Sequence, residues 1–176
     1  MLALARQDYA EAERQLQAAL TIHHRLNAAS DIAEALAFLA LALHSLGHPE
    51  EAWQLLHQSL RLSNHGRIFL TVLEGLLAAG LLLASQDEKQ SAVELYSLTM
   101  RYSLVANSKF YDDVVGRSIR TLTADLPPAV YQAAWERGQA RDLWETTAEF
   151  IAPTGLGIDP LLEQTISIVS GDIWPG

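Results

Sequence analysis

The stretch "SLGHPEEAWQLLHQSL", residues 45–60, decides the fold that we expect. Gly47 and Pro49 predict a turn between two helices, because glycine adopts the left-handed conformation that ends a helix and proline fits the first turn of the next. The two acids after the proline would lie at a helix start, where the helix dipole favours negative charge. From Ala52 onward, large and small residues follow at the spacing of one helix face. The stretch therefore predicts the joint and the second helix of a helix pair.

The same pattern occurs three times at a step of 40 residues, beginning at Ala12, Ala52 and Ala92. The positions 4, 7 and 8 residues after each alanine hold a large, a small and a large side chain: Leu16, Ala19 and Leu20; Leu56, Ser59 and Leu60; Tyr96, Thr99 and Met100. These offsets share one face of an α-helix, and the helix upstream of each of the last two units repeats in the same register. The sequence therefore predicts successive helix pairs.

This pattern resembles the tetratricopeptide repeat (TPR). The unit 33–66 carries its signature best, in Leu36, Leu39, Ala40, Leu43, Ala52, Leu56 and Ser59. The family's repeat is about 34 residues long, shorter than the step found here, and Asn64 stands where the family usually has a proline. Long repeats of this kind, together with the ending "LPPAVYQAAWERGQARDLWETTAEF" at 126–150, resemble the C-terminal TPR arms of bacterial signalling ATPases and LuxR-type transcription regulators.

We therefore expect an all-α fold, an α-solenoid of antiparallel helix pairs that form a TPR-like superhelix with a non-repeat C-terminal tail. Residues 1–105 would form the repeats, residues 106–152 a modified last repeat with capping helices, and residues 153–176 an extended or disordered tail. The helices are expected at 2–5, 8–26, 30–46, 49–63, 67–85, 88–105, 109–124, 128–138 and 141–151. The first unit lacks most of its first helix, so the chain is interpreted as a piece cut from a longer protein.

Charge and composition exclude several classes of protein. The chain has 176 residues and a formal net charge of -9, which disfavours direct binding to nucleic acid and to anionic membranes. It has no cysteine, so no disulfide framework or thiolate metal site is expected, and a cytoplasmic location fits. The apolar run at 68–84 is shorter than the roughly 20 residues that cross a membrane, and it carries Glu74. It reads as a helix buried between neighbours.

The first helix of each pair would line a concave groove, by the TPR resemblance. The predicted groove residues are Glu34, Ala37, Leu41, His44, Glu74, Leu77 and Leu81. An apolar groove with a few polar points suits an apolar helix or an extended peptide. For Leu41 and Leu81, a place in the core between layers is an equal alternative, and Phe38 is expected in the core.

The remaining side-chain combinations are better explained by structural roles than by binding or catalytic sites. His44 and His48 have the spacing of a metal pair, but Gly47 breaks their helix, so no metal or cofactor is expected. Gly80 reads as a close contact between helices and not as part of a phosphate loop. The C-terminal arginines are expected in ion pairs on a solvated face and not in an anion site: Arg117, Arg120, Arg137 and Arg141. No catalytic pattern is found, so an enzyme is not expected.

These observations predict a non-catalytic module that binds a protein or peptide. By resemblance, it would be the sensor or regulatory arm of a larger bacterial signalling or transcription-regulating protein. Two alternatives stay open. One is a structural segment that self-assembles, with the tail 153–176 as the contact, because its apolar content exceeds that of an inert linker. The other is a small-molecule sensor that holds an effector around Leu41, His44 and Leu81.

Overall fold

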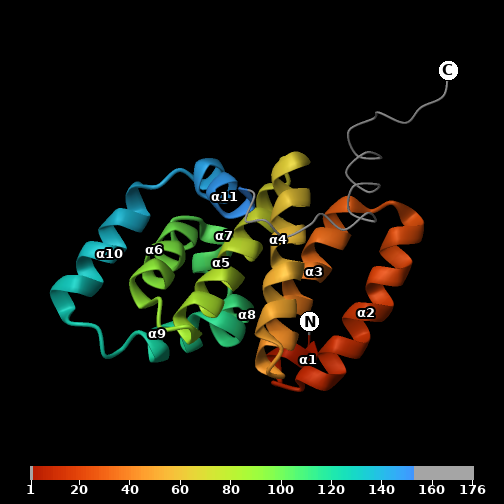
Figure 1. The fold of residues 1–176 in the computed structure, drawn as a ribbon, viewed down its shortest axis with the longest axis horizontal. Helices are drawn as coiled ribbons and strands as arrows, with labels where there is room; N and C mark the ends of the chain where they lie inside the picture. The colour runs from red at the N-terminus through yellow and green to blue at the C-terminus, as the bar shows by residue number, and fades with distance from the viewer. Residues whose placement is uncertain (1, 153–176) are drawn as a thin grey trace.

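The computed structural model describes residues 2–152, and this part of the chain is all-helical, with no strand among these residues (Figure 1). The tail predicted at 153–176 lies outside the described residues. The elements are α1 (Leu2–Ala5), α2 (Tyr9–Leu26), α3 (Ala29–Ser45), α4 (Pro49–His65), α5 (Phe69–Ser85), α6 (Lys89–Met100), α7 (Ser103–Ala106), α8 (Lys109–Tyr111), the π-helical turn η1 (Asp112–Gly116), α9 (Arg117–Leu122), α10 (Pro128–Ala140) and α11 (Leu143–Ile151).

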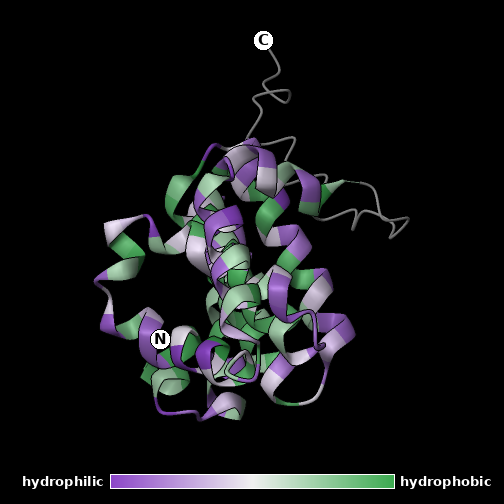
Figure 2. Ribbon diagram, turned by 90° about the vertical axis from the view of Figure 1, so that its left-hand side faces the viewer, coloured by the Kyte–Doolittle hydropathy of each residue, from purple (hydrophilic) through white to green (hydrophobic). Residues whose placement is uncertain are grey.

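From α1 to α6, each helix packs against the next along the chain, and α3 also contacts α5. The core lies along α3 and α5. In Figure 2 the hydrophobic colouring is concentrated on the helices in the middle of the molecule. In α5 every side chain from Thr71 to Leu82 is buried. The apolar run at 68–84 is therefore a helix enclosed by its neighbours, as predicted. No helix in the described residues is both long and apolar enough to cross a membrane.

The residues that define the 40-residue step occupy equivalent buried positions. Ala12, Ala52 and Ala92 lie on α2, α4 and α6 and are 2%, 0% and 0% exposed. In the turn before α4, Gly47 has a φ of +90°, and Pro49 is the first residue of the helix, as predicted. A side chain at Gly47 would be strained by this backbone conformation. The turn prediction is therefore confirmed in atomic detail.

The chain after Met100 is less regular than predicted. The helix expected at 88–105 ends at Met100, and a short α7 follows after an extended Tyr102 (φ -102°, ψ 122°). The ring of Tyr102 packs edge-on against Phe69, with centroids 5.2 Å apart, and this contact accompanies the break in the helix. The helix expected at 109–124 ends at Leu122 and contains a π-helical turn, which no spacing rule had indicated.

The last two helices lie over different parts of the molecule. α10 packs on α6, and Gly138 permits a close approach, because a Cβ there would lie 2.0 Å from Ser97 Oγ and 2.1 Å from the Glu94 carbonyl oxygen. α11 turns back to pack on α4 and α5, where it appears beside α4 in Figure 1. The Arg67 guanidinium lies 4.1 Å from the ring centre of Trp144, which anchors α11 there.

Candidate functional site

The seven predicted groove residues lie on α3 and α5, two helices in mutual contact. Glu34, Ala37, Leu41 and His44 are on α3, and Glu74, Leu77 and Leu81 are on α5. Only two of them, Glu34 and His44, are partly exposed; the other five are at most 8% exposed. Leu41 and Leu81 thus occupy core positions in this structure. Most of the predicted groove residues are therefore covered by other parts of the chain.

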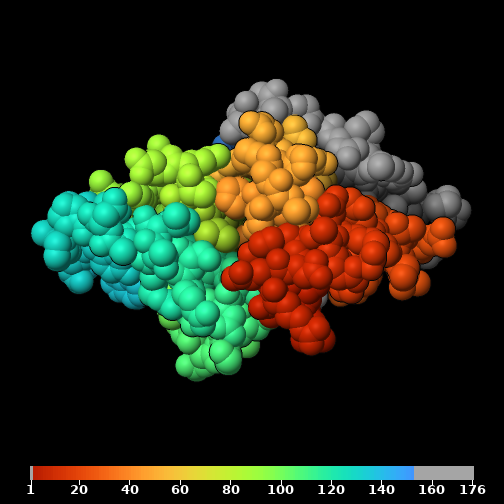
Figure 3. All heavy atoms as spheres, turned by 90° about the horizontal axis from the view of Figure 1, so that it is seen from below, coloured from red at the N-terminus to blue at the C-terminus, as the bar shows by residue number. Residues whose placement is uncertain are grey.

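The cover is the chain's own segment from α7 to α9. Phe110 packs edge-on against Phe38, with ring centroids 5.7 Å apart, and Val115 and Ile119 join the same hydrophobic core. The π-helical turn also contacts α1, and Figure 3 shows the N-terminal residues beside the segment around residue 115. Sequence analysis had placed this segment in a cap at the end of the stack. Its aromatic pair, Phe110 and Tyr111, was the signal available for a position against the predicted groove residues.

A polar contact lies beneath this cover. The Tyr111 hydroxyl donates a hydrogen bond to Glu74 Oε1 at 2.5 Å, and the other carboxylate oxygen of Glu74 is buried without a partner among the described residues. Burial raises the pKa of Glu74 to about 7; the Tyr111 hydrogen bond opposes this rise, and the charge of Glu34 adds to it. Burial and the bond to Glu74 also raise the pKa of Tyr111. A neutral Glu74 carboxyl therefore suits this position better than a carboxylate does.

A hollow of about 280 Å³ lies between α2 and α3, and the predicted groove residue Glu34 is among the residues that line it: Gln15, Leu16, Ala19, His23, Asp31, Glu34, Ala35 and Phe38. Burial raises the pKa of Glu34, and the nearby Asp31 charge raises it further. His23 Nδ1 is buried without a hydrogen-bond partner in the described part of the chain, 3.8 Å from Asp31 Oδ2. The hollow thus combines apolar walls with two carboxylates and an unsatisfied imidazole nitrogen.

Exposed apolar side chains flank this hollow on α2. Ile22 and Leu26, four residues apart on one helix face, are 55% and 68% exposed. A second exposed apolar group lies where α5 begins and α7 follows α6, and it includes Leu70 at 41% and Leu104 at 55%. Neither group was predicted from the sequence, because periodicity shows which face of a helix is apolar but not whether another element covers it.

His44, His48 and the C-terminal arginines do not line the hollow between α2 and α3. His44 is half-buried in α3 and burial lowers its pKa, whereas His48 is exposed in the turn before α4. Within residues 2–152 no group of three or more His, Asp or Glu residues is arranged to hold a metal ion. The four arginines each form an ion pair: Arg117 with Asp113, Arg120 with Asp112, Arg137 with Glu94, and Arg141 with Glu94 and Glu149. The ion-pair interpretation of these arginines is confirmed.

No protein-family model, curated protein or solved structure matches the chain significantly.

Proposed function

We propose that this chain is a non-catalytic protein-interaction module that binds a peptide or a partner helix in the hollow between α2 and α3. The observation that carries the proposal is this hollow of about 280 Å³, which is lined by the predicted groove residue Glu34 and by Phe38. Ile22 and Leu26 extend its apolar wall along α2 and are more than half exposed. Contiguous exposed apolar surface with polar points is typical of sites where proteins bind peptides.

The hollow favours a partner with an apolar anchor and a basic residue. Asp31 and Glu34 lie close enough for the charge of one to raise the pKa of the other, so a Lys or Arg side chain between them would relieve this repulsion. Phe38, Leu16 and Ala35 offer apolar contact to the anchor. An acidic peptide would add a third negative charge and is disfavoured.

The arrangement of the helices as a repeat solenoid is part of the same proposal. Equivalent positions on α2, α4 and α6, together with the contact between α3 and α5, support a TPR-like solenoid of antiparallel helix pairs. By the resemblance of its repeats, the module would act in the cytoplasm as the sensor or regulatory arm of a bacterial signalling or transcription-regulating protein. It would contribute binding, and the output would be supplied by other domains.

The test is selection of short displayed peptides on the full chain, followed by titration against two double variants. Ile22→Gln with Leu26→Gln removes the apolar wall beside the hollow. Leu70→Gln with Leu104→Gln is the matched control, because Leu104 is as exposed as Ile22. We expect selected peptides to carry Lys or Arg beside an apolar residue. The first variant should weaken their binding about tenfold and the control less than about twofold.

Glu34→Gln tests the charge preference separately, and it should reduce the advantage of basic over neutral peptides. The proposal is wrong if no peptide binds more tightly than about 1 mM, or if the control variant weakens binding as much as the Ile22 and Leu26 variant does. Sedimentation of the unliganded chain at several concentrations addresses the alternative. Reversible oligomers that the Ile22 and Leu26 variant dissolves would show that the surface joins copies of the chain, and would replace the peptide proposal.

A further inference from the structure

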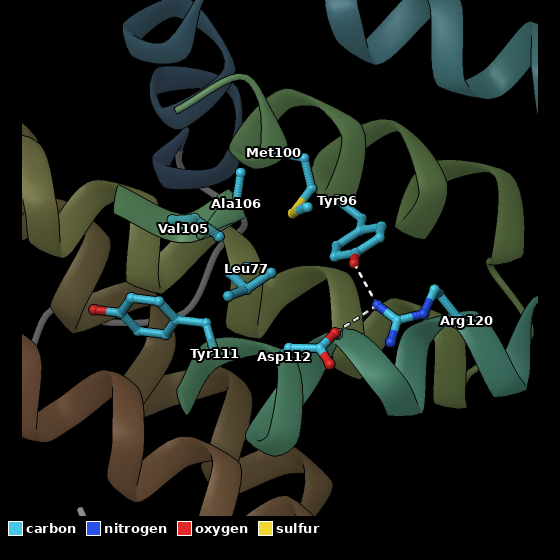
Figure 4. A pocket seen from close by; sticks show the side chains of 9 residues that line it. Leu77, Tyr96, Met100, Val105, Ala106, Tyr111, Asp112 and Arg120 are labelled. Carbon is cyan, nitrogen blue, oxygen red and sulfur yellow. Dashed lines mark hydrogen bonds and ion pairs between the residues drawn. The ribbon is translucent and has the colours of Figure 1, made fainter. Parts of the chain in front are cut away.

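A second cavity is lined by residues of α5, α6, α7, α8, η1 and α9. Its volume is about 80 Å³. Figure 4 shows its lining side chains, and the full set is Leu77, Tyr96, Met100, Val105, Ala106, Tyr111, Asp112, Gly116 and Arg120. This volume is about half of the roughly 150 Å³ apolar cavity that holds a benzene molecule, so the space fits a short aliphatic side chain, with the charged groups of the ligand at the exposed end.

One end of the cavity carries a paired positive and negative charge. Arg120 Nη1 donates to the Tyr96 hydroxyl oxygen at 2.7 Å and lies 2.7 Å from Asp112 Oδ1 (Figure 4). Arg120 Nη2 and Nε form no other hydrogen bond to residues that the structure describes. The two side chains are 44% and 45% exposed, so a ligand can reach both from solvent.

Gly116 lets these three polar groups lie close to the backbone. A Cβ at this position would lie 3.0 Å from Asp112 Oδ1, 3.1 Å from the Tyr96 hydroxyl and 3.2 Å from Arg120 Nη1. Gly116 closes the π-helical turn, and such turns are frequent at functional sites. The bare backbone here therefore gives the three polar groups room that any larger residue would fill.

The opposite end of the cavity is apolar. Leu77 and Val105 are almost completely buried, and Met100 and Ala106 complete this wall. Met100 has an unbranched, polarisable side chain, which adapts to ligands of different shape. The cavity thus presents an apolar half and a half with one cation and one anion.

We propose that this cavity binds a free α-amino acid with an apolar side chain. The ligand's carboxylate would accept hydrogen bonds from the unused N–H groups of Arg120, its ammonium group would donate to Asp112, and its side chain would contact Leu77 and Met100. A ligand with both charges matches the pair without leaving either protein charge unpartnered. A simple carboxylate would lie beside Asp112 uncompensated, and a simple amine would lie beside Arg120.

This inference goes beyond the proposed peptide site and does not rest on it, since no residue lines both cavities. The test is isothermal titration calorimetry of the full chain with L-leucine. Isocaproate, which lacks the ammonium group, and isoamylamine, which lacks the carboxylate, are the paired analogues. We expect saturable binding of L-leucine, and each analogue should bind at least about tenfold more weakly.

Variants test the residues. Arg120→Gln and Asp112→Asn should each weaken leucine binding by at least about tenfold. Arg117→Gln is the matched control, because Arg117 forms a similar ion pair, 2.6 Å from Asp113 Oδ1, from the same helix but outside the cavity. Circular dichroism establishes that each variant is folded, and the analogue series in the unaltered chain stands even if a variant is not.

Three results would overturn the inference. The first is the absence of saturable heat with L-leucine up to about 10 mM. The second is isocaproate or isoamylamine binding as tightly as leucine, since the ligand class would then require only one charge. The third is a loss of affinity in Arg117→Gln equal to that in Arg120→Gln, which would place the site elsewhere.

Discussion

The helices from α2 to α6 and the chain from α7 to α11 obtain their packing in different ways. In the first region, helices of 12 to 18 residues bury one apolar face after another, and equivalent residues recur at a fixed step. In the second, elements as short as the 3-residue α8 are held by individual contacts, such as the Tyr111 hydroxyl on Glu74 and the Gln139 amide on the Ser97 carbonyl oxygen. The first region therefore depends mainly on the amount of apolar surface buried, whereas the second also depends on contacts between particular atoms.

Substitution of Leu56 by Ala should have the largest effect, because it removes apolar surface from the regular region. Leu56 is 0% exposed and lies close to Gly75 on the facing helix. We expect a loss of about 2–5 kcal/mol in the free energy of unfolding, measured by urea denaturation. Leu70→Ala is the control, since Leu70 is 41% exposed and should cost less than about 1 kcal/mol. Equal losses in both variants would mean that the repeats are not the stable part of the fold.

Gly138→Ala tests the irregular region in the same way. The added Cβ would collide with the Glu94 carbonyl oxygen at 2.1 Å, and a backbone atom cannot rotate away. We expect a loss of about 2–3 kcal/mol, even though alanine is the better helix former. In this variant, the amide hydrogens of α10 should be less protected from exchange than those of α3 or α5. Ala133→Val adds volume on the exposed face of α10 and should have little effect. Uniform loss of protection along the chain would contradict the separation of the two regions.

The contact between the regions at Glu74 predicts a dependence of stability on pH. The pKa of Glu74 is raised to about 7 from its ordinary 4.5, so its protonated form is favoured in the folded state. Stability is therefore fully present at low pH and falls as pH rises through about 7, by about 2 kcal/mol between about pH 5 and about pH 8. Tyr111 and Glu34 are the groups that act on this carboxyl, and Glu34 adds to the loss on ionisation.

Thermal unfolding of Glu74→Gln over the same pH range checks this prediction. The neutral amide keeps an acceptor for the Tyr111 hydroxyl and does not ionise, so the variant should lose most of the pH dependence. Glu50→Gln, at the exposed start of α4, is the control and should keep the slope of the unaltered chain. A slope unchanged in Glu74→Gln would assign the pH dependence to another group.

The sequence predicted the first region well, because helix faces and turns have local rules. Gly47, Pro49 and the spacing after Ala52 defined the helix pair without any knowledge of its neighbours. The candidate sites were predicted poorly. Glu34 lines the hollow between α2 and α3, whereas the cover over Glu74 depends on a π-helical turn and on which way Tyr111 points. Such features follow from contacts between residues distant in sequence, which periodicity does not encode.

The smallest predicted effect concerns two positions that repeat in the sequence. It tests whether their side chains contribute equally to the free energy of unfolding. Ser59 and Thr99 occupy the same place in successive units, and both are 0% exposed. The Ser59 hydroxyl donates to the Ala33 carbonyl oxygen on α3 at 2.7 Å, whereas the Thr99 hydroxyl donates within its own helix to the Tyr96 carbonyl oxygen. Only the first bond joins two helices, so Ser59→Ala should cost about 1 kcal/mol.

Thr99→Val keeps the shape of the side chain and should cost less than about 0.5 kcal/mol, because a hydroxyl bonded back to its own helix contributes little stability. Both values come from urea denaturation of otherwise identical chains. An equal loss of stability at Thr99 and Ser59 would show that the hydroxyl stabilises the fold in either hydrogen bond. The two repeat positions would then make the same contribution to stability. A cost confined to Ser59 would show that the repeat fixes only the small size of the side chain, which is what close contact between two helices requires.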